Sequence, residues 1–213
     1  MSTSAARRLI AALLLCALGT RGQTHAVQAP EESLRFGVIG DFGTGTPKQY
    51  ETARAMAAVN VGSRYDMVLM VGDNIYSSWN RRAVVDRFEM PYRSLLDAGV
   101  PFFASLGNHD AIDERQYPLF NMGGERYYSF SRLNVQFFAL DSNYMDAAQL
   151  AWLRRGLEAS TMPWKISVNG PAGGAPSRWR ANAALASLTN ASVSGARSRR
   201  WMDITRCAGT CRV

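Results

Sequence analysis

Short apolar runs alternate with helical patterns along the first half of the chain. Three of these runs end at a glycine and predict buried strands at residues 34–39, 67–71 and 100–106. Residues 50–59 and 83–96 combine helix-forming residues with an apolar face, and a proline near the middle of the second segment is expected to break or kink its helix. Strands that alternate with helices predict a parallel or mixed sheet covered by helices.

The pattern becomes antiparallel in the second half of the chain. Residues 126–130 and 134–140 predict neighbouring strands, joined by a turn at 131–133. An amphipathic helix follows at 146–158, with its first residue, an aspartate, as the expected N-cap. Another strand is expected to begin at residues 163–168. Together these elements predict an α/β (α+β) fold.

The first 26 residues have the layout of a secretory signal peptide. Arg7 and Arg8 precede an apolar run at residues 9–18, and a small-x-small cleavage site ends at Ala26. Ten residues span about 15 Å as a helix, half of a bilayer core, so we expect no stable membrane anchor. The chain is therefore expected to be secreted or periplasmic; an ordinary amphiphilic N-terminus is the alternative.

Charge is distributed unevenly along the 213 residues, whose formal net charge is +7. Residues 1–26 carry +3, residues 27–168 carry −2 and residues 169–213 carry +6. A basic protein would suit a polyanionic partner such as nucleic acid, but here the basicity belongs to the two ends. Hydrophobic residues make up 47% of the chain, which excludes wholesale disorder, and three cysteines are too few for a disulfide-stapled scaffold.

Acidic loops follow the first three predicted strands. They read Gly40-Asp41-Phe42-Gly43, Gly72-Asp73-Asn74-Ile75-Tyr76 and Gly107-Asn108-His109-Asp110. Because the carboxyl ends of parallel strands meet at one edge of a sheet, these loops are expected to gather carboxylates, an amide, an imidazole and a phenol. Carboxylates held together repel one another unless a proton or a cation neutralises them. The combination therefore predicts a metal site, and its donors suit Mn, Fe or Zn.

Each of these residues has an ordinary alternative when it is considered alone. Asp41 could cap a turn, and Asn108 could form one. Tyr76 could be a half-buried aromatic residue, and His109 could be a surface or packing histidine. The metal-site interpretation depends on the three loops occurring together, in this order, each after a buried strand.

With these loops, residues 34–166 resemble the calcineurin-like metallophosphoesterases, and within them the purple-acid-phosphatase-like branch. The resemblance implies a two-sheet sandwich flanked by helices. It also implies a centre of two metals, iron with a second iron, zinc or manganese. In that centre Asp41 would bind the first metal, Asp73 would bridge both metals, and Tyr76 would bind the ferric ion as a phenolate.

The third loop would supply the remaining roles that the resemblance implies. Asn108 would bind the second metal through its amide oxygen, and His109 would contact phosphate and protonate the leaving group. Asp110 would support the ligands from behind. The implied reaction is in-line hydrolysis of a phosphate ester, on a small molecule or a phosphoprotein, and no nucleic acid partner is expected.

The resemblance stops after Ile166. The family's two remaining sequence blocks supply three histidine ligands, but no histidine follows His109 in this chain. We therefore expect residues 27–168 to form the N-terminal portion of the phosphoesterase domain, with the C-terminal half of the fold incomplete. A catalytically inactive fragment is the alternative function.

Residues 169–213 differ in composition from the rest of the chain. Alanine, arginine, serine and glycine make up 26 of these 45 residues, and Asp203 is the sole acid. No part of this segment shows clear strand alternation, and it is expected to form a disordered basic tail. Our hypothesis is that a frameshift near codon 167 produced it. A real polyanion-binding tail, with Trp179 and Trp201 stacking on bases, is the alternative.

Other enzyme classes find less support in the sequence. It contains neither a Gly-x-Ser-x-Gly nucleophile elbow nor a Walker phosphate-binding loop. The glycines at 40, 43 and 45 reverse the spacing of the dinucleotide-binding fingerprint.

Overall fold

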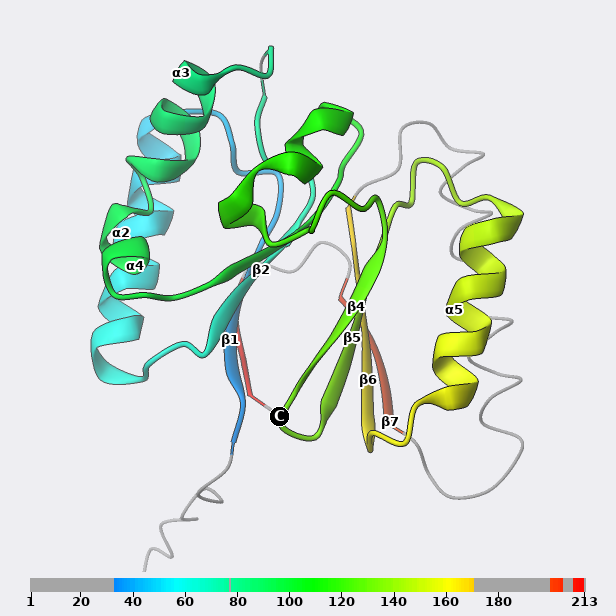
Figure 1. The fold of residues 1–213 in the computed structure, drawn as a ribbon. Coiled ribbons are helices and arrows are strands. Elements are labelled where there is room, and N and C mark those ends of the chain that lie inside the picture. Colours follow the sequence, from blue (N-terminus) through cyan, green and yellow to red (C-terminus); the bar gives the residue numbers. More distant parts are fainter. Residues whose placement is uncertain (1–32, 77, 171–199, 205–208, 213) are drawn as a thin grey trace, which may run out of the picture. The chain divides into compact units, whose positions relative to one another are not determined.

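Two four-stranded sheets form the framework of the computed structural model, which describes residues 33–76, 78–170, 200–204 and 209–212 (Figure 1). The first sheet has the order β3-β2-β1-β8. Its strands are β1 (Arg35–Ile39), β2 (Met67–Val71), β3 (Phe102–Ser105) and β8 (Gly209–Arg212). β1, β2 and β3 are parallel, whereas β8 lies antiparallel to β1. Every residue of the central strand β2 is buried, because this strand is covered on both faces.

The second sheet has the order β4-β5-β6-β7. Its strands are β4 (Tyr128–Arg132), β5 (Val135–Leu140), β6 (Trp164–Asn169) and β7 (Arg200–Ile204). β4 and β5 form an antiparallel hairpin, whereas β5, β6 and β7 are parallel. The crossover from β5 to β6 runs through helix α5 (Ala147–Ala159), whose N-cap Asp146 accepts the Gln149 N–H at 2.8 Å. Asp146 therefore fixes the start of α5, as the sequence predicted.

Three helices and one π-helical turn connect the parallel strands of the first sheet. α2 (Pro47–Gly62) joins β1 to β2. Between β2 and β3 lie α3 (Arg81–Val84), the π-helical turn η1 (Val85–Glu89) and α4 (Arg93–Asp97). The helical segment is interrupted at Pro91, between η1 and α4, because proline has no N–H group with which to continue the helical hydrogen bonds. Two 3-10 helices, η2 (Ile112–Gln116) and η3 (Pro118–Phe120), follow β3.

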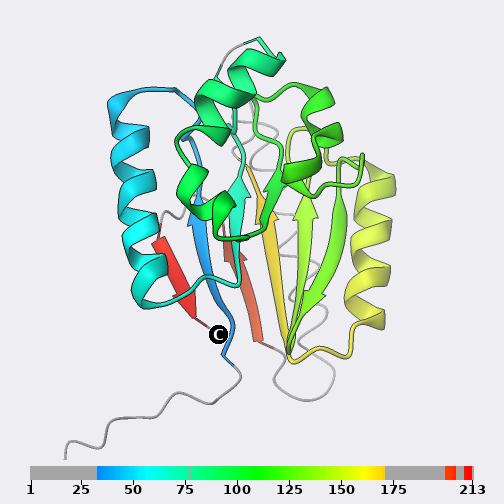
Figure 2. The same cartoon turned by 60° about the vertical axis from the view of Figure 1, so that its left-hand side comes forward.

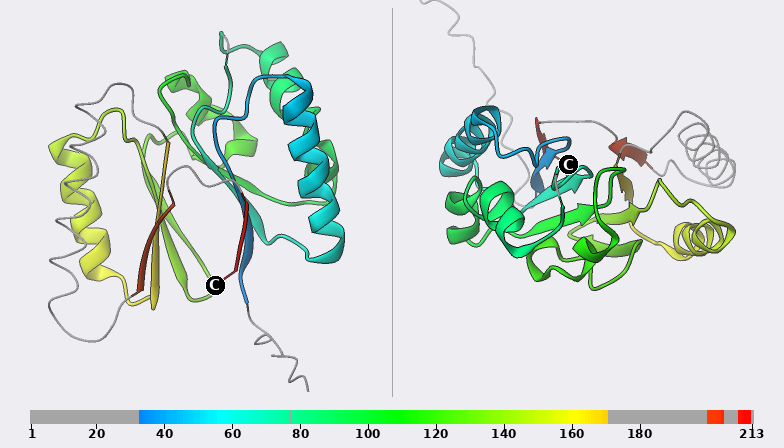
Figure 3. Two further views of the ribbon diagram at one scale, coloured as in Figure 1. Left: turned by 180° about the vertical axis from the view of Figure 1, so that it is seen from behind. Right: turned by 90° about the horizontal axis from the view of Figure 1, so that it is seen from above.

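The layers are stacked in the order helices, sheet, sheet, helix when viewed from above (Figure 3). α2, α3 and α4 cover the outer face of the first sheet, and α5 covers the outer face of the second (Figures 1 and 2). Between the two sheets lies a core that includes Phe36 and Leu69 from one sheet and Phe137 and Ile166 from the other. A second core under α2–α4 is centred on Phe88, which is fully buried.

The architecture confirms the predicted two-sheet α/β fold, with shifts in several boundaries. α2 is longer than the predicted helix at 50–59, and β4 begins two residues later than predicted. The hairpin turn consists of Leu133 and Asn134, and not of residues 131–133; the φ of 49° at Leu133 allows the reversal. η2 and η3 were not predicted, because 3-10 turns have no apolar period of their own.

The sequence shows no clear strand alternation after residue 168, but the structure has two strands there. β6 continues to Asn169, and both β7 and β8 lie within the basic tail. Apolar–polar alternation is a poor guide here, because pairing to β6 and β1 depends on backbone hydrogen bonds that residues of any type but proline can make. Residues 171–199 and 205–208 lie outside the described residues, as does Trp179.

The predicted signal peptide, residues 1–26, also lies outside the described residues. In the part of the chain that is described, no helix is both long enough and apolar enough to cross a membrane. The N-terminal leader and its cleavage therefore remain predictions.

Candidate metal centre

The three acidic loops lie together at the carboxyl end of the first sheet. Since β1, β2 and β3 are parallel, the loops that follow them emerge at the same edge, which is uppermost in Figure 1. Backbone hydrogen bonds join the first two loops: the Asp41 N–H donates to the Gly72 carbonyl at 3.2 Å, and the Tyr76 N–H donates to the Gly43 carbonyl at 2.9 Å. The loops therefore form one packed unit.

Two of the loop carboxylates are held on unusual backbone. Asp41 has a φ of 54° and Asp73 a φ of 53°, in the left-handed region that few residues other than glycine adopt. Aspartate tolerates this region better than most residues, but strained backbone persists only where the surroundings hold it, and it is concentrated at functional sites. Asp41 and Asp73 occupy equivalent positions, two residues after the ends of β1 and β2. Their left-handed backbone directs both carboxylates toward the space between the loops.

Glycine allows the loops to approach this closely. A Cβ atom at Gly43 would lie 1.7 Å from the Asn74 carbonyl oxygen, and one at Gly107 would lie 2.2 Å from Asp73 Oδ1. Both are far inside van der Waals contact, so no other residue fits without moving the neighbouring loop. Gly43 and Gly107 are therefore steric requirements of the site.

Three oxygen-bearing side chains converge between the first two loops. The Tyr76 hydroxyl lies 2.8 Å from Asp73 Oδ2 and 3.1 Å from Asp41 Oδ1. Asp73 Oδ1 accepts the backbone N–H of His109 at 3.1 Å, which ties in the third loop. Asp73 is buried, whereas Asp41 is exposed and lies on the solvent side of the cluster.

The surroundings of Asp73 and Tyr76 shift the pKa values of both groups. Burial raises the pKa of Asp73, hydrogen bonds from Tyr76 and His109 partly oppose the rise, and the neighbouring Asp41 adds to it. Burial and the two carboxylates raise the pKa of Tyr76 well above its usual value. Without a cation, the phenol proton is therefore held between two carboxylates, in a position where positive charge is favoured.

His109 and Asn108 lie on the third loop, beside this cluster. The His109 ring centroid is 4.8 Å from that of Tyr76, with the two planes inclined at 38°. Both residues are exposed. The Asn108 side chain forms no hydrogen bond with the residues that the structure describes, so the structure brings this residue near the carboxylates without fixing its amide.

Asp110 links the second and third loops from behind. Its carboxylate accepts hydrogen bonds from Asn74 N at 2.6 Å, Asn74 Nδ2 at 2.8 Å, Ile75 N at 3.1 Å and Gly107 N at 2.8 Å. Burial raises its pKa to about 6, although these donors hold it down. Asp110 thus fixes the spacing of the loops that carry Asp73 and His109.

Several supporting residues were missed by the sequence analysis. Asn74 donates to Asp110 and to the Ser105 carbonyl, and buried Glu114 accepts the Ala111 N–H. Arg87 donates to the Tyr76 carbonyl, and Gln49 accepts the Gly45 N–H. Asn74 lies inside a recognised loop and could have been given a role. The other three carry no signal, because their partners are distant in sequence.

The donors present suit part of a two-metal centre. Asp41 and Asp73 each lie within hydrogen-bond reach of the Tyr76 hydroxyl, and the three side chains offer hard oxygen donors that suit a hard cation. Among the described residues, no three or more His, Cys, Asp or Glu side chains are grouped so that they could hold a metal. The whole sequence contains one histidine besides His109, His25, which lies outside the described residues.

Comparison with known proteins identifies the family. The calcineurin-like phosphoesterase family model matches residues 34–182. This chain belongs to that family. Among curated phosphoesterases it is similar to tartrate-resistant acid phosphatase type 5 from Sus scrofa, with 32% identity over 106 residues, which cover 45% of this chain and 31% of the relative. The corresponding Mus musculus protein is 30% identical over 99 residues, covering 42% and 30%. The match thus spans about a third of these relatives, and the resemblance to a purple-acid-phosphatase-like phosphoesterase is confirmed.

Solved structures support the phosphoesterase fold. A dimetal phosphatase from Danio rerio matches with a TM-score of 0.60 and 17% identity, covering 81% of this chain and 86% of that one. GAP50, the anchor in the inner membrane complex of Plasmodium, matches with a TM-score of 0.60 and 17% identity, covering 76% and 63%. At this identity the likeness concerns the fold alone.

Proposed function

We propose that this chain is built to hydrolyse phosphate esters, as an acid-phosphatase-like phosphomonoesterase, at the edge of the sheet formed by β1, β2 and β3. The observation that carries the proposal is the convergence of Asp41 and Asp73 on the Tyr76 hydroxyl. In this site one proton is shared by two carboxylates and a phenol. A bound cation would neutralise the negative charge of these groups more completely than that proton does. Membership of the calcineurin-like phosphoesterase family points to the same chemistry.

The side chains divide the work of this reaction between them. Asp41, Asp73, Tyr76 and Asn108 would hold the metals, which supply charge neutralisation for the phosphoryl oxygens and activation of water. The His109 N–H and the Tyr76 hydroxyl each donate to one oxygen of the Asp73 carboxylate and fix its orientation. His109 is exposed at the mouth of the site, where its imidazole can reach a leaving-group oxygen and give it a proton. Asp110 keeps the two loops in register.

Iron paired with a second iron, zinc or manganese is the metal content that we propose. Tyr76 supports iron, since phenolate is a hard anionic donor. The substrate would be a phosphate monoester on a small molecule or a phosphoprotein. We further propose secretion through a signal peptide at residues 1–26, and that residues 27–168 form the N-terminal portion of the phosphoesterase domain.

An inactive phosphoesterase fragment is the second candidate. The observation that favours it is the absence of any histidine after His109 in the sequence. A frameshift near codon 167 would explain this absence together with the Ala/Arg/Gly/Ser-rich composition of residues 169–213. The nucleotide sequence tests that explanation: an alternative downstream frame should encode histidine-bearing blocks, and their absence from both frames would refute it.

Metal analysis combined with turnover of 4-nitrophenyl phosphate tests the proposed function. The full chain should retain metal through gel filtration and hydrolyse the ester, and Asp73→Ala should lose both properties. Asp113→Ala, which removes an exposed carboxylate on η2, is the matched control and should keep both. Retained metal without turnover would favour the inactive fragment, and a metal-free, inert parent chain would refute the proposed enzyme.

A further inference from the structure

A hollow of about 240 Å³ lies beside the loop after β1, and Asp41 is one of the residues that line it. Its inner wall is formed by Ile39, Gly40 and buried Phe42. The outer wall is polar, and its side chains come from the loop after β1 and the first turns of α2: Thr44, Thr46, Lys48, Gln49 and Thr52. Because Asp41 belongs to both the hollow and the carboxylate cluster, a ligand bound at the cluster could extend directly into the hollow.

The outer wall is held in place by hydrogen bonds. The Thr44 and Thr46 hydroxyls lie 2.8 Å apart, and Gln49 Oε1 accepts the Gly45 N–H at 2.7 Å. Gln49, which is buried, also donates through its amide nitrogen to the Arg87 carbonyl. The hollow is therefore a formed feature of the loop and not a gap between loose side chains.

The same hydrogen bonds connect the hollow to the candidate metal centre. The guanidinium group of Arg87 donates to the Tyr76 carbonyl, while its backbone carbonyl accepts from Gln49. Arg87 thus spans from the wall of the hollow to the loop that carries the phenol ligand. A group bound in the hollow would be held at a fixed position relative to Asp41 and Tyr76.

The chemistry of the wall selects the ligand. Among the described residues that line the hollow, Lys48 is the one cationic side chain, and the threonine hydroxyls there can donate hydrogen bonds. We propose that this hollow binds the leaving-group portion of the substrate and prefers leaving groups that carry a second anionic group, a carboxylate or another phosphate. This inference rests on the proposed function and narrows its substrate class. Lys48 is then a specificity-determining residue, and it takes no part in the chemical step.

Two esters that differ in one group test the preference. Phenyl phosphate and 4-carboxyphenyl phosphate share the ring and the ester, and only the second carries a remote carboxylate. Their dissociation constants would be measured by calorimetry on the full chain in the presence of Mn²⁺. The expected result is binding of both esters, with the carboxylated ester bound about fivefold more tightly.

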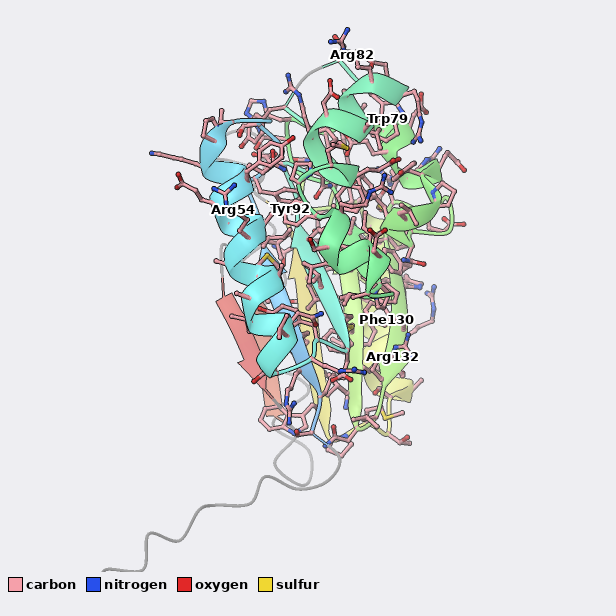
Figure 4. The ribbon with its side chains drawn as sticks, turned by 90° about the vertical axis from the view of Figure 1, so that its left-hand side faces the viewer. Arg54, Trp79, Arg82, Tyr92, Phe130 and Arg132 are labelled. Carbon is pink, nitrogen blue, oxygen red and sulfur yellow. The ribbon has the colours of Figure 1, made fainter. Side chains whose placement is uncertain are left out.

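Lys48→Gln should remove that difference while leaving the affinity for phenyl phosphate unchanged. Arg54→Gln is the matched control: Arg54 is exposed on the same helix α2, carries the same charge and does not line the hollow (Figure 4). This variant should keep the fivefold preference.

Each remaining outcome contradicts a different claim. Equal binding of the two esters by the parent chain, or equal loss of preference in Lys48→Gln and Arg54→Gln, would overturn the anion-binding role of the hollow and leave the proposed function standing. Failure of the parent chain to bind either ester would overturn the proposed function, and this inference with it.

Discussion

At the scale of single residues, Asp110 joins two loops of the site through the hydrogen bonds of its carboxylate. Its two carboxylate oxygens accept three backbone N–H groups and one side-chain amide, from two loops more than 30 residues apart in sequence. A buried N–H group that loses its acceptor costs about 1–3 kcal/mol. Asp110 therefore contributes to folding as well as to the geometry of the site.

We expect Asp110→Ala to lower the free energy of unfolding by about 3–5 kcal/mol, because the N–H groups of Asn74, Ile75 and Gly107 lose their acceptor. Urea denaturation followed by circular dichroism measures the change. Asp113→Ala, on the exposed side of the next turn, should stay within about 0.5 kcal/mol of the parent chain. Equal effects of the two substitutions would contradict the role assigned to Asp110.

Glu114 is a second buried acid behind the site, and it makes stability depend on pH. Burial, reinforced by the charges of Asp110 and Asp73, raises the pKa of Glu114 from 4.5 to about 9. The folded chain therefore binds this proton more tightly than the unfolded chain does. Its stabilising effect is complete below pH 4.5 and is lost as the pH rises toward 9.

Glu114→Gln should remove this dependence, since the neutral amide has no proton to lose. Relative to the parent chain, the variant should gain on the order of 4 kcal/mol of unfolding free energy between pH 5 and pH 8. Urea denaturation of metal-free protein across this range measures the gain. The exposed control Glu125→Gln should follow the parent chain at every pH, and a parallel curve for Glu114→Gln would contradict the raised pKa.

The sequence predicted that four residues lie close together, because each follows a predicted strand of a parallel sheet: Asp41, Asp73, Tyr76 and His109. It could not find Glu114, whose acidic side chain reads as a surface residue until the packing of η2 buries it. Nor could it find Arg87, whose contact with the Tyr76 carbonyl depends on how η1 lies against the loops. Contacts made by tertiary packing leave no local pattern.

At the scale of elements, the loops after β1 and β2 touch through their backbones. Gly43 lies directly against the Asn74 carbonyl, and the Gly43 carbonyl accepts the Tyr76 N–H. This contact sets the distance between the elements that carry Asp41 and Tyr76. A side chain at residue 43 would have to push the two loops apart.

Gly43→Ala should therefore lower the free energy of unfolding by about 3 kcal/mol and also weaken metal binding. Gly62→Ala is the matched control, because a Cβ at the end of α2 would meet no atom within 4 Å. That substitution should stabilise the chain slightly, by at most about 1 kcal/mol. Thermal unfolding with metal titration compares the two variants, and a neutral Gly43→Ala would contradict the close packing of the loops.

The element scale also explains which parts of the fold were predictable. Buried parallel strands and the capped helix α5 have strong local patterns, and both were predicted. The interruption between α3 and α4 was anticipated through its proline, but the π-helical turn η1 was not. β7 and β8 were missed because each completes a sheet whose other strands precede it by many residues.

At the scale of the whole molecule, the described residues form both sheets, but the proposed metal ligands all come from one of them. Asp41, Asp73, Tyr76 and Asn108 all follow strands of the first sheet. Gly170, at the end of β6 in the second sheet, reaches the same edge, since a Cβ on it would lie 2.9 Å from Gly107 Cα. The second sheet thus approaches the site without bringing an imidazole to it.

A ferric titration followed by visible absorption tests the central claim, that Asp41, Asp73 and Tyr76 bind metal together. We expect a charge-transfer band that saturates with added iron and is absent from both Tyr76→Phe and Asp73→Asn. Tyr144→Phe, which alters an exposed phenol outside the cluster, should keep the band. A parent chain that develops no band, or a band that survives in Tyr76→Phe, would contradict the proposed metal centre.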